Sequence, residues 1–228
     1  MTHIVHPYAH RLGIIRDWKS RWFGVGAQYK KFLREDVLIR RFLDARLRGL
    51  YVAVVEVERS NRKLRIVIKT ARPGMLIGRQ GEGAVRLKEN LKKFMAKEQI
   101  PSDGLQIDVE EIRVPEANAA IVAQMVVEGL EKRMPFRRVL KQTIEKVMAS
   151  RDVKGARIAI SGRLGGAEMS RKEQVKKGRL PLQTFRADID FARATAHLSY
   201  GTIGVKSWVY RGDIFKEKAK KRIKNNEE

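Results

Sequence analysis

Two glycines, Gly78 and Gly81, enclose a polar dipeptide between two stretches with the periodicity of helices. The stretch before them, Met75-Leu76-Ile77, is short, and the stretch after them places its apolar residues on one helical face. That face contains Ala84, Leu87, Leu91, Phe94 and Met95. Because glycine lacks a Cβ, the backbone here can approach another molecule closely, and the amide groups that start the second helix favour an anion. The pattern predicts a phosphate-binding loop between two helices.

The segments around this loop define its context. Residues 29–50 repeat apolar side chains at helical spacing, residues 51–57 and 64–68 alternate as the strands of a hairpin, and residues 105–110 alternate as a third strand. The order of helix, strand, strand, short helix, Gly-x-x-Gly, helix and strand over residues 27–113 matches a type II KH domain, an RNA-binding fold. A lone Gly-x-x-Gly is more often a simple turn. In this order it predicts RNA contacts by Gly78, Arg79, Gln80 and Gly81.

The chain is strongly basic. Of its 228 residues, 49 are Lys or Arg and 26 are Asp or Glu, which gives a formal net charge of +23. Such an excess indicates a polyanionic partner, and nucleic acid fits best. The apolar content of 43% is that of a globular chain, so the charge must be carried on a folded core. At this length we expect two small domains.

The second half of the chain predicts another α/β domain. Residues 115–134 and 135–150 have helical periodicity. Strand character follows in residues 157–161, 184–198 and 202–211. We therefore expect an α+β protein whose N-terminal type II KH domain precedes a second domain, residues 114–215, of two helices packed on a mostly antiparallel sheet.

The two ends are expected to be irregular. Pro7 and several glycines interrupt residues 1–26, which predicts an N-terminal arm. Its aromatic residues either dock the arm on the protein's own core or stack on RNA bases, and the sequence leaves both open. Residues 216–228 are rich in Lys and Arg and poor in apolar side chains, which predicts a basic tail.

One predicted helix, residues 136–150, carries cations together. At 100° per residue, Arg137, Arg138 and Lys141 fall in one arc beside the apolar arc, so they face outward together. A solvated surface would pair them with Glu145 or Glu131. Because the chain has few acids for its many cations, we favour RNA as their partner.

Patterns for catalysis are weak. The chain has no cysteine, which excludes disulfides, thiolate chemistry and cysteine-based zinc sites. Asp188 and Asp190 lie on one side of a predicted strand, and with Glu168 they suggest a Mg²⁺ site of a nuclease or lyase. We expect salt bridges to arginine instead, and hence no enzyme and no cofactor.

Metal and membrane patterns are weak as well. His3, His6 and His10 are spaced like metal ligands, but Pro7 breaks any helix that would gather them, so we expect no metal. No run approaches the ~18 apolar residues that a membrane span requires, and the N-terminus lacks a secretory pattern. A chain of the cytoplasm, without membrane contact, is expected.

Longer strings, spread over about residues 4–215, resemble the small-subunit ribosomal protein three family of the bacterial type. They are Val5-His6-Pro7, Arg11-Leu12-Gly13, Thr70-Ala71-Arg72-Pro73-Gly74, Ile77-Gly78-Arg79-Gln80-Gly81, Phe136-Arg137-Arg138 with Lys141, Ser161-Gly162-Arg163-Leu164-Gly165-Gly166-Ala167-Glu168, Arg186-Ala187-Asp188-Ile189-Asp190, Tyr200-Gly201 and Ile203-Gly204-Val205-Lys206. Collinear strings of this length are far more specific than any single motif.

The resemblance implies a structural component of the head of the small ribosomal subunit. It implies binding of small-subunit rRNA through both domains, contacts with neighbouring head proteins, and a position at the channel through which mRNA enters. There Arg137, Arg138 and Lys141 would hold and help to unwind the message. The rRNA contacts that we predict are Arg11, Arg72, Arg163, Arg171, Lys177, Arg179 and Arg186.

Two departures and two alternatives accompany this interpretation. Ala9-His10 replaces a pair that usually contains glycine, and Gln80 replaces a residue that is often basic, which weakens the grip expected of the loop on phosphate. A free KH-type RNA-binding or RNA-processing factor would share the loop but would not need the strings between Gly162 and Lys206. A nuclease or lyase rests on a few carboxylates alone.

Overall fold

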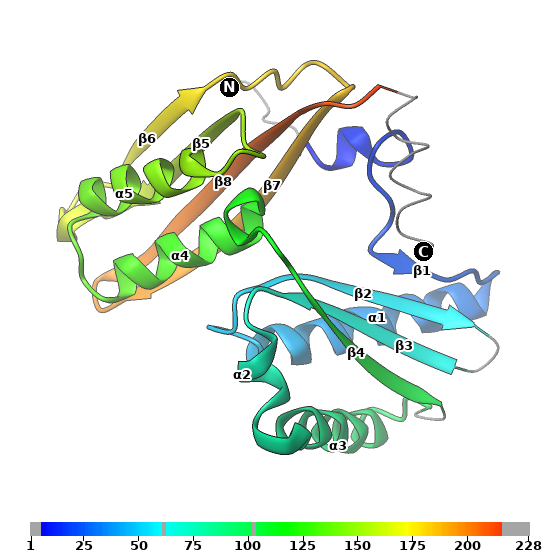
Figure 1. Ribbon diagram of the computed structural model, residues 1–228. Helices are drawn as coiled ribbons and strands as arrows, with labels where there is room; N and C mark the ends of the chain where they lie inside the picture. The colour runs from blue at the N-terminus through cyan, green and yellow to red at the C-terminus, as the bar shows by residue number, and fades with distance from the viewer. Residues whose placement is uncertain (1–5, 61–62, 102–103, 216–228) are drawn as a thin grey trace. The chain divides into compact units, whose positions relative to one another are not determined.

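The chain folds into two compact units (Figure 1). The computed structural model describes residues 6–60, 63–101 and 104–215. Trp18–Arg113 form one unit, here called the KH unit. Residues 6–17 join residues 114–215 in the other, here called the C-terminal unit.

These units differ in their limits from the predicted segments. The described residues of the predicted arm, 1–26, are shared between the units, since the chain passes from one to the other after Asp17. The predicted tail, 216–228, lies outside the described residues. The predicted domain limits, 27–113 and 114–215, stay predictions.

The KH unit contains a four-stranded sheet with two long helices on one of its faces. Its elements are β1 (Ser20–Arg21), α1 (Ala27–Arg46), β2 (Val52–Ser60), β3 (Lys63–Thr70), α2 (Pro73–Ile77), η2 (Arg79–Gly81), α3 (Glu82–Lys97) and β4 (Leu105–Glu111). The strand order is β1-β2-β3-β4, with β2 and β3 antiparallel and each outer strand parallel to its neighbour. Leu43 of α1 and Leu91 of α3 are fully buried in one core with Ile66 of β3.

The other face of this sheet is covered by ion pairs. Arg65 of β3 lies 2.6 Å from Asp108 and 3.3 Å from Glu58. Lys69, on the same strand, lies 3.2 Å from Glu56, and it is also paired with the neighbouring strand β4. Hydrogen bonding from Arg65 lowers the pKa of Asp108. The predicted alternation of apolar and charged residues along 105–110 is therefore observed.

The C-terminal unit also places two helices on one face of a four-stranded sheet. Its elements are η1 (Ala9–Arg11), η3 (Pro115–Ala117), α4 (Ala119–Glu131), α5 (Phe136–Ala149), β5 (Gly155–Gly162), η4 (Leu164–Gly166), β6 (Arg171–Gly178), β7 (Ala187–Leu198) and β8 (Gly201–Asp213). The strands are in the order β6-β5-β8-β7, and all neighbours are antiparallel. The predicted α+β fold class is confirmed.

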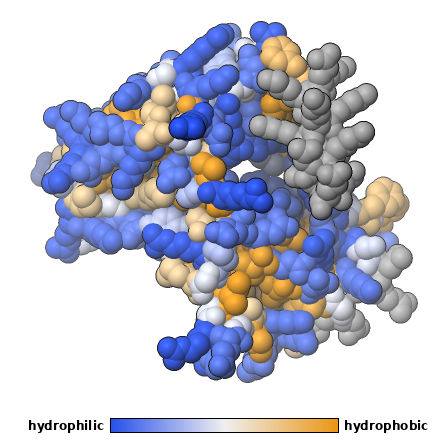
Figure 2. All heavy atoms as spheres, in the orientation of Figure 1, coloured by the Kyte–Doolittle hydropathy of each residue, from blue (hydrophilic) through white to orange (hydrophobic). Residues whose placement is uncertain are grey.

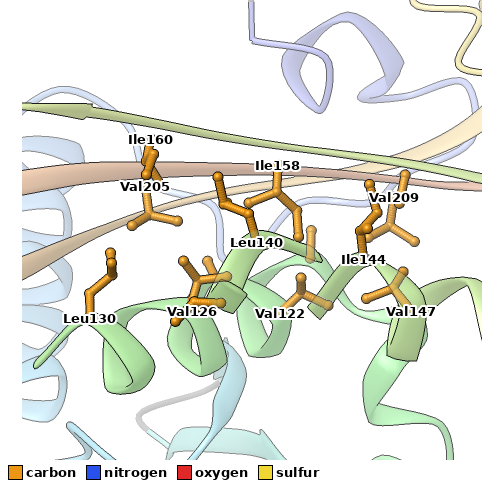
Figure 3. Close-up of a cluster of buried hydrophobic side chains, with 14 of the residues drawn as sticks. Val122, Val126, Leu130, Leu140, Ile144, Val147, Ile158, Ile160, Val205 and Val209 are labelled. Atoms are coloured by element: carbon orange, nitrogen blue, oxygen red, sulfur yellow. The ribbon is translucent and has the colours of Figure 1, made fainter. Parts of the chain in front are cut away.

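The core of this unit lies between the helices and the sheet, as Figure 3 shows. Val126 of α4 and Leu140 of α5 point toward Ile158 of β5 and Val205 of β8, and all four are at most 1% exposed. Burying one such side chain is worth roughly 1.5–3 kcal/mol, so this layer holds α5 firmly on the sheet. The polar side of α5 is thereby turned away from the core.

The strand β6 was not predicted. Its sequence, Arg171-Lys-Glu-Gln-Val-Lys-Lys-Gly178, has one apolar residue, so it lacks the alternation that marks a half-buried strand. Because β6 is the edge strand of the sheet, its backbone pairs with β5 alone and most of its side chains remain exposed. Backbone pairing, rather than burial, therefore specifies this strand.

Candidate RNA-binding surfaces

The Gly-x-x-Gly loop connects α2 to α3 by a backbone path that requires its glycines. Gly78 and Gly81 have φ values of +71° and +83°, in the region that favours glycine, and Gln80 also has a positive φ of +54°. No atom lies within 4 Å of the position where a Cβ of Gly81 would be, so the backbone there is open. Arg79 and Gln80 are exposed. The loop thus presents bare backbone and one cation.

A carboxylate stands at the start of α3, directly after this loop. Glu82 is the first helical residue, where an anion is favoured and where a phosphate would compete with it. Arg86, one turn later, lies 3.0 Å from Glu82 and partly neutralises it. A hollow nearby is lined by Gln80, Val85 and Glu89 together with these two residues. The electrostatics of the loop are therefore only weakly favourable to phosphate.

Exposed apolar side chains next to the loop were missed by the sequence analysis. Met75 is 58% exposed, Ile77 38% and Val85 57%. For Val85 the signal was present, because it falls outside the apolar face formed by Leu87 and Leu91 of α3, whereas the short helix α2 gave no such signal for Met75 and Ile77. Nucleotide bases stack or pack on such surfaces in RNA-binding modules, so the loop is flanked by a surface that suits bases.

The three cations of α5 lie where the helical spacing placed them. Arg137, Arg138 and Lys141, here called the α5 cations, are all exposed, and the surface over α5 in Figure 2 is mostly hydrophilic. Glu131, one of the two acids expected to pair with them, accepts a hydrogen bond from the backbone amide of His197. Arg137 instead donates to Glu173 of β6, with Nη2 3.2 Å from Oε1, and this hydrogen bond raises the pKa of Arg137.

Arg171 joins the α5 cations from the edge strand. Its guanidinium lies 5.3 Å from the centre of the Phe136 ring, and that of Arg137 lies 5.7 Å from the same ring. Arg171 also lies 3.8 Å from Glu173. Within the described part of the chain, Arg138 and Lys141 have no ion-pair partner. The cluster therefore has four cations and one carboxylate.

The other predicted rRNA contacts are scattered over both units. Arg72 stacks 4.6 Å from the Tyr51 ring in the KH unit. In the C-terminal unit, Arg163 donates to the carbonyl oxygens of Ala167 and Tyr200, which braces the glycine-rich turn η4. Lys177 and Arg179 are exposed near the end of β6, and Arg186 is exposed and lies 3.5 Å from Asp213. All five guanidinium or ammonium groups reach the surface of their units.

Comparisons with known proteins cover both units. The family described as "KH domain" matches residues 38–117, and the family described as "Ribosomal protein S3, C-terminal domain" matches residues 126–209. A small ribosomal subunit protein uS3 from Caldicellulosiruptor bescii is 45% identical over 215 residues, which are 94% of each chain. One from Syntrophomonas wolfei is 46% identical over 220 residues, which are 96% of this chain and 93% of that protein. The chain belongs to the uS3 family.

Membership of the uS3 family confirms the predicted resemblance and a structural role in the ribosome rather than an enzymatic one. The Gly-x-x-Gly loop lies inside the matched KH region, and the α5 cations lie inside the matched C-terminal region. Among the described residues, no helix is long and apolar enough to cross a bilayer.

The prediction for Arg11 is corrected by the structure. Arg11 is fully buried, and its guanidinium donates to four backbone carbonyl oxygens, with Nε 2.6 Å from that of Ala187. The other acceptors are the carbonyl oxygens of Pro7, Leu182 and Thr184. Burial lowers the pKa of Arg11, although Asp188 acts in the opposite direction. Arg11 is thus occupied in holding the N-terminal residues on the unit and is withdrawn as an rRNA contact.

Two of the three carboxylates and two of the three histidines considered for metal binding have other contacts. Asp188 lies 2.5 Å from Arg16, and Asp190 accepts from the backbone amide of Ala119 and pairs with Arg211. In residues 6–60, 63–101 and 104–215, no three His, Asp or Glu side chains are close enough to hold a metal ion together. His6 packs edge-on against Phe191, His10 lies against Phe185, and His3 is outside the described residues.

The aromatic residues of the predicted arm divide between protein contacts and exposed positions. Trp22 lies 5.5 Å from Tyr29 and 5.7 Å from Phe32, between ring centres, and these are residues of α1 in the same unit. Phe23, in contrast, is 86% exposed. Packing against α1 therefore accounts for Trp22, whereas Phe23 and Trp18, the latter 59% exposed, remain on the surface.

Proposed function

We propose that this uS3 family chain is a structural component of the head of the small ribosomal subunit, where it binds small-subunit rRNA through both units and contacts neighbouring head proteins. We further propose that it lines the channel through which mRNA enters, and that the α5 cations hold the message and favour its unpaired form. The relatives' name, small ribosomal subunit protein uS3, supports a place in the small subunit, and the surface of α5 supports the second statement.

The α5 cations carry the proposal for mRNA. They stand on a helix whose other side is packed in the core, so they form a fixed array rather than a mobile one. Within the described residues, Glu173 alone offsets their charge. An unpaired strand has phosphates free to follow such an array, whereas a duplex holds them in a rigid double row. A fixed array at a narrow opening would therefore favour single strands without hydrolysing anything.

The Gly-x-x-Gly loop supports a smaller share of RNA binding. Arg79 is its one cation, and Glu82 opposes an incoming phosphate. We therefore assign to the KH unit a contact made by bare backbone and by the exposed apolar residues Met75, Ile77 and Val85, with less charge than the contact at α5.

Sedimentation of the native protein tests the ribosomal role. In a cell lysate the chain should migrate with small subunits and remain with them through a high-salt wash, since a protein embedded in rRNA is held by many contacts at once. A free KH-type factor would move to the top of the gradient at high salt. That result would overturn the proposal.

A further inference from the structure

The two faces of the C-terminal sheet differ in what covers them. The core side chains of α4 and α5 cover the face that contains Ile158, Ile160 and Val205. Side chains alternate along a strand, so Arg157, Ala159 and Ser161 of β5 point to the opposite face. Part of that face is covered by a smaller cluster around Phe191 and Trp208. The rest is open.

The strand register assembles cations on this open face. Opposite Arg157, Ala159 and Ser161, the neighbouring edge strand places Lys176, Gln174 and Lys172. On the other side of β5, β8 places Trp208, Lys206 and Gly204, and β7 beyond it places Phe191, Arg193 and Thr195. These positions form three rows across four strands and include no carboxylate. Five of them are cations, here called the sheet cations: Arg157, Lys172, Lys176, Arg193 and Lys206.

Several of these cations directly oppose one another. Arg157 is paired in register with Lys176, and Lys206 with Arg193. Like charges in directly opposite positions destabilise a sheet. The open face of the KH sheet is arranged in the contrary way, since Arg65 faces Glu58 and Lys69 faces Glu110 in register. One sheet of this protein neutralises its own open face, and the other does not.

Aromatic rings beneath the face support two of the guanidinium groups. That of Arg157 lies 4.8 Å from the centre of the Trp208 ring, and that of Arg193 lies 5.4 Å from the Phe191 ring. Arg157 also donates to the side chain of Gln174. Trp208 and Phe191 are only 2% and 6% exposed, so they are not free to stack on nucleotide bases. The face offers positive charge without a means of reading sequence.

We propose that the sheet cations bind the phosphate backbone of an RNA segment, on the side of the sheet opposite to the α5 cations. The proposal rests on the RNA-binding function proposed above and adds a second, separate surface to it. A polyanion would relieve the repulsion between the opposed cations, and two surfaces on opposite sides would let the unit hold rRNA and a second strand without competition. Binding at this face should be steeply dependent on salt and indifferent to sequence.

A charge-matched comparison tests this surface. The full-length chain is titrated with a short mixed-sequence RNA duplex at several salt concentrations, beside the triple variant Lys172→Gln, Lys176→Gln, Lys206→Gln. The control, Lys92→Gln, Lys93→Gln, Lys97→Gln, removes the same charge from exposed positions of α3. Each lost phosphate contact lowers the slope of log affinity against log salt by ~0.9. We expect the magnitude of this slope to fall by roughly 2 to 3 in the sheet variant and by less than about 1 in the control.

Lysine acetylation of the unaltered chain gives a readout that does not depend on how the variant folds. Addition of the duplex should protect Lys172, Lys176 and Lys206 from the reagent. Equal reactivity with and without RNA, or a slope that falls equally in the two variants, would overturn the sheet surface while leaving RNA binding intact. Failure of the unaltered chain to bind the duplex at all would overturn the proposed function itself.

Discussion

Arg137 of α5 and Glu173 of β6 form an ion pair between a helix and the edge strand beside it, with Nη2 3.2 Å from Oε1 and Nε 3.4 Å from Oε2. The same carboxylate lies 3.8 Å from Arg171. One acid thus restrains Arg137, which is one of the α5 cations, and Arg171 beside them. An incoming phosphate must compete with Glu173 for both guanidinium groups.

Removing this acid should therefore strengthen RNA binding. In Glu173→Gln both arginines remain and the competing charge is lost, so affinity for a single-stranded RNA should rise by roughly two- to fivefold, the size typical of an exposed pair. Glu168→Gln, which removes an exposed acid from the same unit, serves as the control. Binding titrations at one fixed salt concentration measure the change. Weaker binding by Glu173→Gln would show that Glu173 positions the arginines rather than masking them.

The packing of α2 on α3 predicts an effect on stability. A Cβ at Gly83 would lie 2.5 Å from the carbonyl oxygen of Leu76, whereas a Cβ at Gly74 would meet no atom within 4 Å. Alanine stabilises a helix more than glycine does, so a substitution by alanine should destabilise the protein only where the added Cβ clashes. Gly83→Ala should lower the free energy of unfolding by about 1–3 kcal/mol, and Gly74→Ala should leave it unchanged or raised. Urea unfolding measures both, and equal effects would mean that α2 moves aside.

The buried position of Arg11 predicts a second effect on the stability of the protein. Arg11→Met keeps the length of the side chain but leaves the carbonyl oxygens of Ala187 and three other residues without their donor. Unfolding free energy should fall by at least about 1–3 kcal/mol. Arg41→Met, at an exposed position of α1, should change it little. If Arg11→Met kept its stability and lost salt dependence in RNA binding instead, Arg11 would be an RNA contact as first expected.

Local patterns in the sequence were sufficient for most of the fold and for the α5 cations. Helical and strand periods reflect burial on one side, and burial is what organises α3, α5 and the central strands. The strand β6 was not predicted, because an edge strand formed by charged residues buries little apolar surface and so lacks a pattern of burial. Because β6 was not predicted, the sequence did not place Glu173 next to α5, and the acid that pairs with Arg137 could not be identified.

Arg11 was misjudged for a different reason. Its four acceptors include the carbonyl oxygens of Leu182, Thr184 and Ala187, which lie more than 170 residues away in the sequence. No local pattern reports such contacts. The sheet cations were likewise visible only once the register of four strands was known, because they come from segments that are distant in sequence.

The loop of the KH unit gives a prediction about charge. Arg79→Asp with Gln80→Asp places two negative charges beside Glu82, where a phosphate would lie. Aspartate tolerates the positive φ of Gln80, so the circular dichroism spectrum should be unchanged. RNA affinity of the full chain should fall by more than in the control Gln28→Asp with Arg41→Asp, which makes the same change in charge on α1. Equal losses would point to net charge alone, and the loop would then have another partner, such as a protein.

The α5 cations give the prediction most specific to translation. Replacing Arg137, Arg138 and Lys141 by Ala removes exposed side chains and little apolar surface, so the fold and the assembly of the subunit should survive. The variant would then have fewer fixed cations with which to hold the unpaired strand, so a hairpin in the message should open more slowly. In a reconstituted translation assay, a message with a stable hairpin after the start site should slow more than a matched message without one. The control Lys92→Ala, Lys93→Ala, Lys97→Ala should slow neither. If the α5 variant slowed both messages by one factor, or neither message, unwinding would have to be abandoned and these residues assigned to rRNA anchoring.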